Sequence, residues 1–206
     1  MRVLGIDPGS RYLGFGVVER HGQKFTHVGH GVVRADPRAP LADRLSQIFV
    51  GLREAVLRYA PDVVAVEGVF HHKNARSALI LGHARGVALL IAAQSGLAVH
   101  EYAPARVKRA VGANGNAGKR AVARMVTTLL KLAPEKERSD AFDALAVALC
   151  HLGREGLPQP QRSRREADVP DAFRARLKPA WVGSSRGQTA RTLELKPAVS
   201  RPVIAR

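Results

Sequence analysis

The first 153 residues alternate between stretches with the period of a β-strand and stretches with the period of an α-helix. "RVLGID", "LGFGVVER" and "KFTHVGHGVVR" are short and mostly apolar, and the turn residues "HGQ" separate the second from the third. We therefore expect three strands joined by hairpin-like links. The next stretch, "PLADRLSQIFVGLREAVLRYA", predicts a helix. Its apolar residues recur at helical spacing: Leu41, Leu45, Ile48, Phe49, Leu52, Val56 and Leu57.

The rest of this region predicts two more strands and four more helices. "PDVVAVEGVF" is apolar almost throughout, as a strand covered on both faces of a sheet would be, and "LAVHEYA" is the fifth strand. Between them, "NARSALILGHARGVALLIAAQSG" is a long helix that is apolar on nearly every side. We expect its own sheet and a second subunit to cover it. Further helices are expected over residues 104–111, 119–132 and 139–153.

This order of elements predicts an α/β fold, a mixed five-stranded sheet with helices on both faces. Strands linked by hairpins pair antiparallel, whereas strands linked through helices pair parallel. Residues 1–153 would form this domain. Residues 154–206 contain six prolines, scattered arginine, serine and glycine, and no sustained periodicity, which is the composition of a disordered tail. The apolar cluster around Trp181 is interpreted as an isolated hydrophobic patch rather than a docking motif.

Charge is the strongest signal in the overall composition. The chain has 33 Lys plus Arg against 17 Asp plus Glu, a formal net charge of +16, and residues 154–206 contribute +7 of it. Such a surplus favours a polyanionic partner. Nucleic acid is preferred to an anionic membrane surface, because no basic amphipathic helix of the interfacial kind stands out.

Other compositional features favour a cytoplasmic protein without a membrane partner. No run of about 18 consecutive apolar residues occurs, so no membrane-spanning segment is expected. The amino terminus lacks the layout of a secretory signal. Cys150 is the single cysteine, which excludes an intrachain disulfide and fits a reducing compartment.

Four acidic residues stand where the predicted fold would bring them together. Asp7 ends the first strand in "LGIDPGS", and Glu67 lies near the carboxyl end of the fourth. Ligands of α/β sheets bind at the carboxyl ends of strands, so adjacent first and fourth strands would place these two acids side by side. In "SDAFDALAVAL", Asp140 and Asp143 are three residues apart, which puts both carboxylates on one face of the last helix.

Three of these acids, taken singly, also have a structural explanation. Asp7 can close an Asx-turn before Pro-Gly. Asp140 and Asp143, in the first turn after the candidate N-cap Ser139, can complement the helix dipole. Glu67 is harder to explain in this way, since glutamate is rarely buried without a partner.

Taken together, the four acids point to a metal site. Two carboxylates about 4 Å apart repel each other by about 4 kcal/mol at an effective dielectric constant of about 20, so a converging group must take up protons or bind cations. Ligands that are all oxygen select Mg²⁺ or Mn²⁺ rather than zinc. Two such ions, about 3.5–4 Å apart, serve in-line phosphodiester hydrolysis. The carboxylate shared by both ions is expected from the rigid first strand, which suits Asp7.

Several separated motifs closely resemble the RuvC family of Holliday junction resolvases in order and spacing. They are "LGIDPGSRYLGFGVVE", "VEGVFHHKNARSALILGHARGVAL", "RMVTTLLKLAP" and "SDAFDALAVALCH". The resemblance covers residues 1 to about 153 and implies a ribonuclease H-like homodimer that makes paired, metal-dependent nicks across a four-way DNA junction in recombination and repair. It also implies a RuvA–RuvB branch-migration complex as partner. It assigns the catalytic and metal-binding tetrad to Asp7, Glu67, Asp140 and Asp143.

The same resemblance suggests residues that contact DNA. Phe70 stands where the family presents an aromatic ring at the junction centre, and a ring there can stack on an unpaired base. The alternative is an ordinary core phenylalanine. Lys108 and Lys119 match family lysines near the active-site cleft, where they would contact phosphates, and Lys119 could also stabilise transition-state charge. Neighbouring basic residues are further candidates, with solvated surface as the alternative: Lys73, Arg76, Arg85, Arg109 and Arg120.

Two other functions fit parts of the pattern. A phosphotransfer ATPase of the actin and sugar-kinase type also has a Gly-x-Asp-x-Gly turn after its first strand, but it needs a duplicated fold and a second phosphate loop. "GANGNAGKR" is not that loop, because five residues rather than four separate Gly112 and Gly118. The second alternative is a junction-binding scaffold without catalysis. The four acids argue against it, since carboxylates in a DNA cleft repel phosphate unless metal is present.

Overall fold

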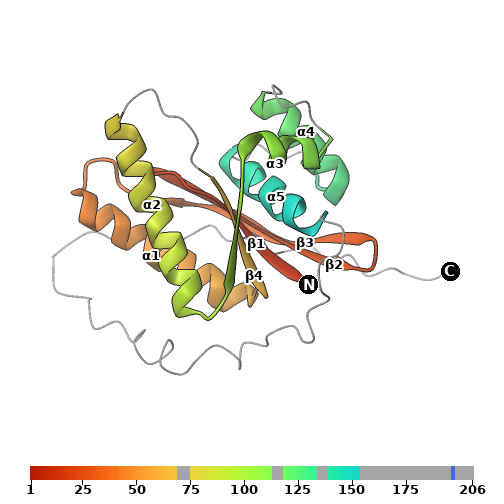
Figure 1. Ribbon diagram of the computed structural model, residues 1–206, viewed down its shortest axis with the longest axis horizontal. Coiled ribbons are helices and arrows are strands. Elements are labelled where there is room, and N and C mark those ends of the chain that lie inside the picture. Colours follow the sequence, from red (N-terminus) through yellow and green to blue (C-terminus); the bar gives the residue numbers. More distant parts are fainter. Residues whose placement is uncertain (69–74, 113–117, 134–138, 154–195, 198–206) are drawn as a thin grey trace.

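The computed structural model describes residues 1–68, 75–112, 118–133, 139–153 and 196–197 (Figure 1). Its strands are β1 (Arg2–Asp7), β2 (Tyr12–His21), β3 (Lys24–Arg34), β4 (Val63–Glu67), β5 (Ala98–Tyr102) and β6 (Lys196–Pro197). Its helices are α1 (Leu41–Tyr59), α2 (Ala75–Gln94), α3 (Pro104–Ala110), α4 (Lys119–Leu130) and α5 (Ser139–Leu152). Every strand and helix predicted between residues 1 and 153 is present, with ends shifted by only a few residues.

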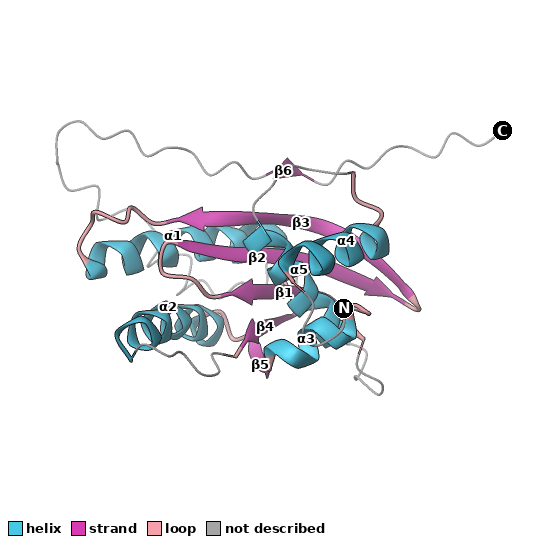
Figure 2. Ribbon diagram, turned by 90° about the horizontal axis from the view of Figure 1, so that it is seen from above, coloured by secondary structure: helices cyan, strands magenta, loops and turns pink. Residues whose placement is uncertain are grey.

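The strands form one mixed sheet in the order β5-β4-β1-β2-β3-β6 (Figure 2). β1, β2 and β3 pair antiparallel, whereas β1 with β4 and β4 with β5 pair parallel. A tight turn joins β2 to β3, and Gly22 adopts a φ of 59° there, a left-handed conformation that glycine tolerates best. The predicted α/β fold with a mixed sheet is therefore confirmed.

The sheet contains one short strand more than predicted. β6 pairs antiparallel with β3, with Gly29 opposite Pro197 and His30 opposite Lys196. Proline lacks an N–H and is tolerated in a strand at the edge of a sheet. The remainder of residues 154–206, including Trp181, lies outside the described residues, so the predicted disorder of the tail stays a prediction.

Helices cover both faces of the sheet. Figure 1 shows α1 and α2 on one side and α3, α4 and α5 on the other. Neighbouring residues of a strand point to opposite faces, so Leu4 and Val64 pack against α1 and α2, whereas Val3 and Ala65 join the core beneath α5. The two cores explain why β1 and β4 are apolar along nearly their whole length.

Two glycines let the backbone of α5 lie directly on the sheet. A Cβ atom on Gly14 of β2 would stand 1.9 Å from the carbonyl oxygen of Asp140, and one on Gly5 of β1 would stand 2.1 Å from that of Ala144. No real side chain tolerates such distances, so any larger residue would push the helix away. The glycines thus determine how close the first turn of α5 comes to the ends of β1 and β2.

Helix α2 is buried on one side only. Ala84, Ala88 and Ile91 belong to the core shared with α1, whereas the side chains of Leu79 and Leu90 are 64% and 50% exposed. The sheet, as predicted, and α1 therefore cover one face, whereas Leu79 and Leu90 are exposed on the opposite face, and the predicted cover by a second subunit stays a prediction.

The sequence has no run of 18 consecutive apolar residues, but one helix of the described residues is long and apolar enough on average to be a candidate membrane span. By length and composition alone, residues 77–94 of α2 qualify, with a mean hydropathy of 1.4 and 22% of the window buried. One such helix within the described residues is weak evidence for a span, because core helices of soluble proteins meet the same criterion.

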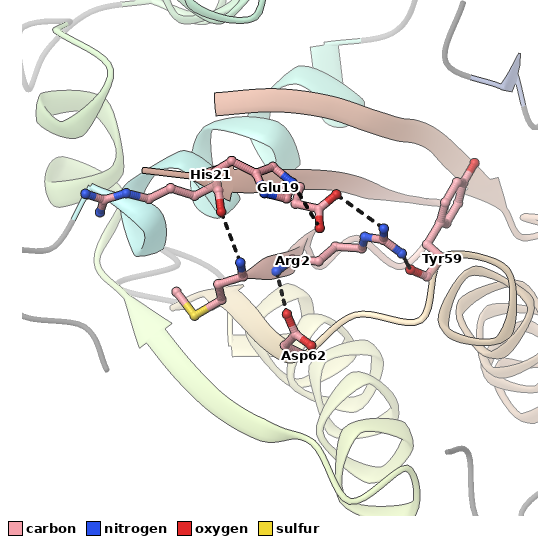
Figure 3. Close-up of polar contacts among 7 residues, drawn as sticks. Arg2, Glu19, His21, Tyr59 and Asp62 are labelled. Carbon is pink, nitrogen blue, oxygen red and sulfur yellow. Dashed lines mark hydrogen bonds and ion pairs between the residues drawn. The ribbon is translucent and has the colours of Figure 1, made fainter. Parts of the chain in front are cut away.

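A polar network fastens the amino end of β1, far from the strand end that carries Asp7 (Figure 3). The Arg2 guanidinium donates to the carbonyl oxygen of Tyr59 at 2.6 Å and pairs with Glu19 at 3.3 Å. The backbone N–H of Arg2 donates to the Asp62 carboxylate at 2.7 Å. These contacts tie β1 to the end of α1 and to the segment that enters β4.

Candidate active site

Parallel pairing of β1 with β4 brings the first two acids together. Ile6 is paired with Val66, so the next residues, Asp7 and Glu67, are neighbours at the carboxyl edge of the sheet. The chain leaves β1 through Pro8 and Gly9, and a Cβ on Gly9 would stand 1.9 Å from the carbonyl oxygen of Tyr12. The turn is therefore folded tightly onto the start of β2, which leaves Asp7 at the strand end.

The first turns of α5 supply the other two acids. Ligand oxygen atoms of Asp7, Asp140 and Asp143 all lie within 4.8 Å of one another. Glu67 joins this group through Asp7, whose carboxyl group is hydrogen-bonded to the Glu67 carboxylate. The structure thus brings together all four predicted acids.

Burial and mutual repulsion favour the protonated forms of three of the acids when no metal ion is bound. Burial, followed by the charges of Glu67 and Asp143, raises the pKa of Asp7 from 3.8 to about 8. Burial also raises the pKa of Glu67 and, despite the nearby Lys119 ammonium, that of Asp143. An apolar sheet edge holding several carboxyl groups would bind a divalent cation in exchange for these protons.

Lys119 forms ion pairs with the two acids of α5. Its Nζ lies 3.4 Å from an Asp140 oxygen and 3.2 Å from an Asp143 oxygen. Burial alone would lower the pKa of Lys119, but the carboxylates of Asp143 and Asp140 outweigh burial and raise it. Lys119 begins α4, and its side chain is 63% exposed, so the ammonium can also reach a ligand in solvent.

The acids open into a pocket of about 290 Å³. Besides Asp7, Glu67, Lys119 and Asp140, its lining includes three residues that sequence reasoning missed: Tyr12, Leu81 and Pro104. They come from the start of β2, from α2 and from the start of α3. No local pattern marks them, because they meet only when these elements pack around the end of β1.

The structure describes some of the other predicted DNA-contact residues and leaves others outside the described residues. Lys108 on α3 is half-buried and close enough for its charge to lower the pKa of Glu67 and of Asp143. Arg120 follows Lys119 on α4 and is exposed, as is Arg109 on α3. Arg85 instead pairs with Glu101 at 2.5 Å. Phe70 and Lys73 lie outside the described residues, and Arg76 is described only as part of the α2 backbone.

The donor set suits a hard divalent cation. All the ligand groups that converge are carboxylates, and oxygen donors are what Mg²⁺ and Mn²⁺ prefer. Burial, with repulsion from neighbouring carboxylates, raises the pKa of Asp7 and of Asp143, and a bound divalent cation would favour their ionised forms. The residues present therefore fit a divalent metal ion.

Comparison with known proteins agrees with this site. The family model for crossover junction endodeoxyribonuclease RuvC matches residues 3–151. The RuvC of Myxococcus xanthus (strain DK1622) is 60% identical over 185 residues, which cover 88% of this chain and 97% of that protein. That of Trichlorobacter lovleyi (strain ATCC BAA-1151 / DSM 17278 / SZ) is 51% identical over 74% of this chain and 85% of its own length.

Solved structures give the same result for the fold. The RuvC structure from Thermus thermophilus is 37% identical, has a TM-score of 0.67, and is matched over 74% of this chain and 94% of that one. The same protein in complex with a Holliday junction substrate matches with 36% identity and the same TM-score and coverage. These matches confirm the predicted ribonuclease H-like fold. The chain, with its four acids gathered at the end of β1, belongs to the RuvC family of crossover junction endodeoxyribonucleases.

Proposed function

We propose that this protein resolves four-way DNA junctions by paired, metal-dependent hydrolysis of phosphodiester bonds in homologous recombination and DNA repair. One observation carries the proposal: ligand oxygens of Asp7, Asp140 and Asp143 lie within 4.8 Å of one another, and Asp7, Asp140 and Glu67 line a pocket. The net charge of +16 supports DNA as the substrate. The complex of the Thermus thermophilus relative with a Holliday junction supports the four-way form.

The proposed cofactor is Mg²⁺ or Mn²⁺, with two ions held by Asp7, Glu67, Asp140 and Asp143. When bound, such ions supply an activated water and stabilise the leaving oxygen of an in-line displacement. Asp7 stands between Glu67 and the two acids of α5, so it is the residue best placed to serve both halves of the site. Its raised pKa means that it must give up a proton before it can act as a ligand.

Lys119 has two roles in this proposal. Without metal, its ammonium pairs with Asp140 and Asp143 and offsets the repulsion between them. With metal in place, the same flexible side chain is free to turn toward a DNA phosphate, where it would stabilise the charge that develops during hydrolysis. Lys108, whose charge reaches Glu67 and Asp143, and Arg120, next to Lys119 on α4, would also bind DNA phosphates.

The remaining DNA contacts rest on the family resemblance. Phe70 would stack on an unpaired base at the junction centre, and Lys73 and Arg76 would contact the backbone nearby. All three follow Glu67 within ten residues of the sequence, and Phe70 and Lys73 lie outside the described residues.

The open face of α2 supports a homodimer. Exposed Leu79 and Leu90 lie on this helix with Gly82 and Gly86, where an added Cβ would meet nothing within 4 Å. Spacings of three, four and four residues place all four on one side of a helix. An apolar, small-residue face of this kind suits close packing against a second copy. Two copies would provide the two active sites that paired nicking needs.

The proposal also includes cytoplasmic localisation and a RuvA–RuvB complex as partner. Residues 154–206 would add sequence-independent affinity for DNA, since they contribute +7 to the net charge. No contact within the described residues bears on how partner proteins dock.

A direct experiment compares wild type with Asp7→Asn on labelled duplex, fork and four-way junction DNA in Mg²⁺. Wild type should nick the four-way junction at two symmetrical positions and leave the duplex intact. The variant should bind the junction with similar affinity and should not nick it. Full nicking by Asp7→Asn would refute the metal assignment. Binding without any nicking by wild type would favour the scaffold.

A further inference from the structure

A hydrogen bond between a buried tyrosine and a buried histidine links β5, which pairs with the strand of Glu67, to α5, which carries Asp140 and Asp143. The Tyr102 hydroxyl at the end of β5 lies 2.7 Å from Nδ1 of His151 near the end of α5, which is hydrogen-bonding distance. The two residues are only 2% and 1% exposed. Neither touches the pocket, and the chemistry proposed above uses neither.

The backbone of Tyr102 is tied directly to Glu67. The two residues are paired across β4 and β5, and the N–H of Gly68 donates to the carbonyl oxygen of Tyr102 at 2.8 Å. Any displacement of Tyr102 along the strand therefore moves the backbone that carries Glu67.

The side chain of His151 belongs to the helix that carries Asp140 and Asp143. Near its beginning, the backbone of α5 lies directly on Gly14 and Gly5, and these contacts set the distance between the helix and the sheet. Near its end, the bond to Tyr102 is directional and buried. Arg20 adds a second such bond by donating to the carbonyl oxygen of Leu152 at 2.6 Å.

Neighbouring groups hold the two rings in place. His100 packs against the ring of His151 with centroids 4.7 Å apart, and Tyr102 meets that ring edge-on at 5.9 Å. The guanidinium of Arg106, on α3, lies 5.5 Å from the Tyr102 ring centre. With its ring confined in this way, the Tyr102 hydroxyl has little freedom to leave Nδ1.

We propose that Tyr102 and His151 form a positioning pair, whose hydrogen bond holds α5 at the axial position that keeps Asp140 and Asp143 at the correct distance from Glu67. This inference rests on the proposed assignment of those acids as metal ligands. Carboxylates on separate elements bind a metal ion well only if their spacing is held to a fraction of an ångström. The pair touches neither metal nor DNA and acts only through this spacing.

The test is Tyr102→Phe, which removes the hydroxyl and keeps the ring. Single-turnover nicking at limiting Mg²⁺ should fall about ten-fold, which is the usual loss when a supporting partner of a metal ligand is removed. The Mg²⁺ concentration for half-maximal rate should rise several-fold, and saturating Mg²⁺ should restore much of the rate. The dissociation constant for the junction, measured in Ca²⁺, should stay within about two-fold of wild type.

Tyr59→Phe is the matched control. Its hydroxyl is also buried, it lies on the opposite face of the sheet, and it makes no hydrogen bond within the described part of the chain. This variant should match wild type in rate and in Mg²⁺ dependence. A second pair of variants provides the test if Tyr102→Phe does not fold. His151→Asn keeps a polar atom near the position of Nδ1, so it should retain more activity than His151→Leu.

Several results would overturn the positioning role. Lower thermal stability of Tyr102→Phe with an unchanged Mg²⁺ midpoint would show that the pair only stabilises the fold. Equal activity of the two His151 variants would do the same. These failures leave metal-dependent nicking by wild type and its loss in Asp7→Asn untouched, so they are distinguishable from failure of the proposed function itself.

Discussion

The substitution Asp7→Asn should abolish nicking and, at the same time, stabilise the metal-free protein at neutral pH. Asp7 lies among partly buried carboxyl groups, where its ionised form is disfavoured first by burial and then by the charges of Glu67 and Asp143. Asparagine has nearly the same shape, carries no charge at any pH, and can still donate to the Glu67 carboxylate. The variant therefore removes an electrostatic penalty and leaves the packing intact.

The size of the effect follows from the pKa of Asp7. Its folded-state pKa is raised from 3.8 to about 8, so its contribution to stability is fully present below pH 3.8 and is lost as the pH rises toward 8. Each pKa unit corresponds to about 1.4 kcal/mol, which allows at most about 4 kcal/mol by pH 7. We expect about 2–3 kcal/mol after the neighbouring groups relax, or about 5–10 °C in melting temperature for a domain of this size.

The assay is thermal unfolding in EDTA between pH 4 and pH 8.5. The melting temperature of Asp7→Asn should exceed that of wild type by an amount that grows with pH and levels off near pH 8. Excess Mg²⁺ should stabilise wild type and should have little effect on the variant. Asp43→Asn, at an exposed position on α1, is the control and should show no such trend. A pH-independent difference, or equal stabilisation of both proteins by Mg²⁺, would refute the reasoning.

Four other substitutions or deletions test separate parts of the molecule. Gly14→Ala should force the first turn of α5 away from β2, cost about 1–3 kcal/mol of folding free energy and lower nicking far more than junction binding. Leu90→Arg should convert the dimer to a monomer in light scattering, whereas an unchanged mass would exclude α2 as the interface. Phe70→Ala should reduce cleavage more than binding, and equal losses would identify a core residue. Deleting residues 154–206 should preserve nicking but weaken junction affinity, most visibly as salt is raised; unfolding would contradict the assignment of a separate tail.

Repulsion among the four acids should couple metal binding to DNA binding. Neutral pH favours ionised carboxylates, but the structure brings four of them together on rigid elements. The cost of that arrangement is offset by protons, by Lys119 or by metal ions, and only metal ions allow all the acids to ionise together. Metal binding and DNA binding should therefore reinforce each other, because cations at the site also remove the repulsion between these acids and phosphate.

Local elements could be predicted from the sequence because local periodicity encodes them. The helical stripe of α1, the apolar runs of β1 and β4 and the turn at Gly22 depend on neighbours a few residues away. The spacing of Asp140 and Asp143 is equally local, so their shared face could be predicted as well. Asp7 and Glu67 were predicted as metal ligands from their places at the ends of predicted strands, and the family motifs implied the same residues.

Other features depended on contacts between residues far apart in the chain. The sequence determined that Asp7 and Glu67 end strands, but only the pairing of β1 with β4 made them neighbours. Three other features join elements that are far apart in the sequence. They are the ion pairs of Lys119, the packing of Tyr12 and Leu81 around the pocket, and the bond between Tyr102 and His151. A side chain's type and local spacing limit what it can bind, whereas the packing of strands and helices decides which side chains it meets.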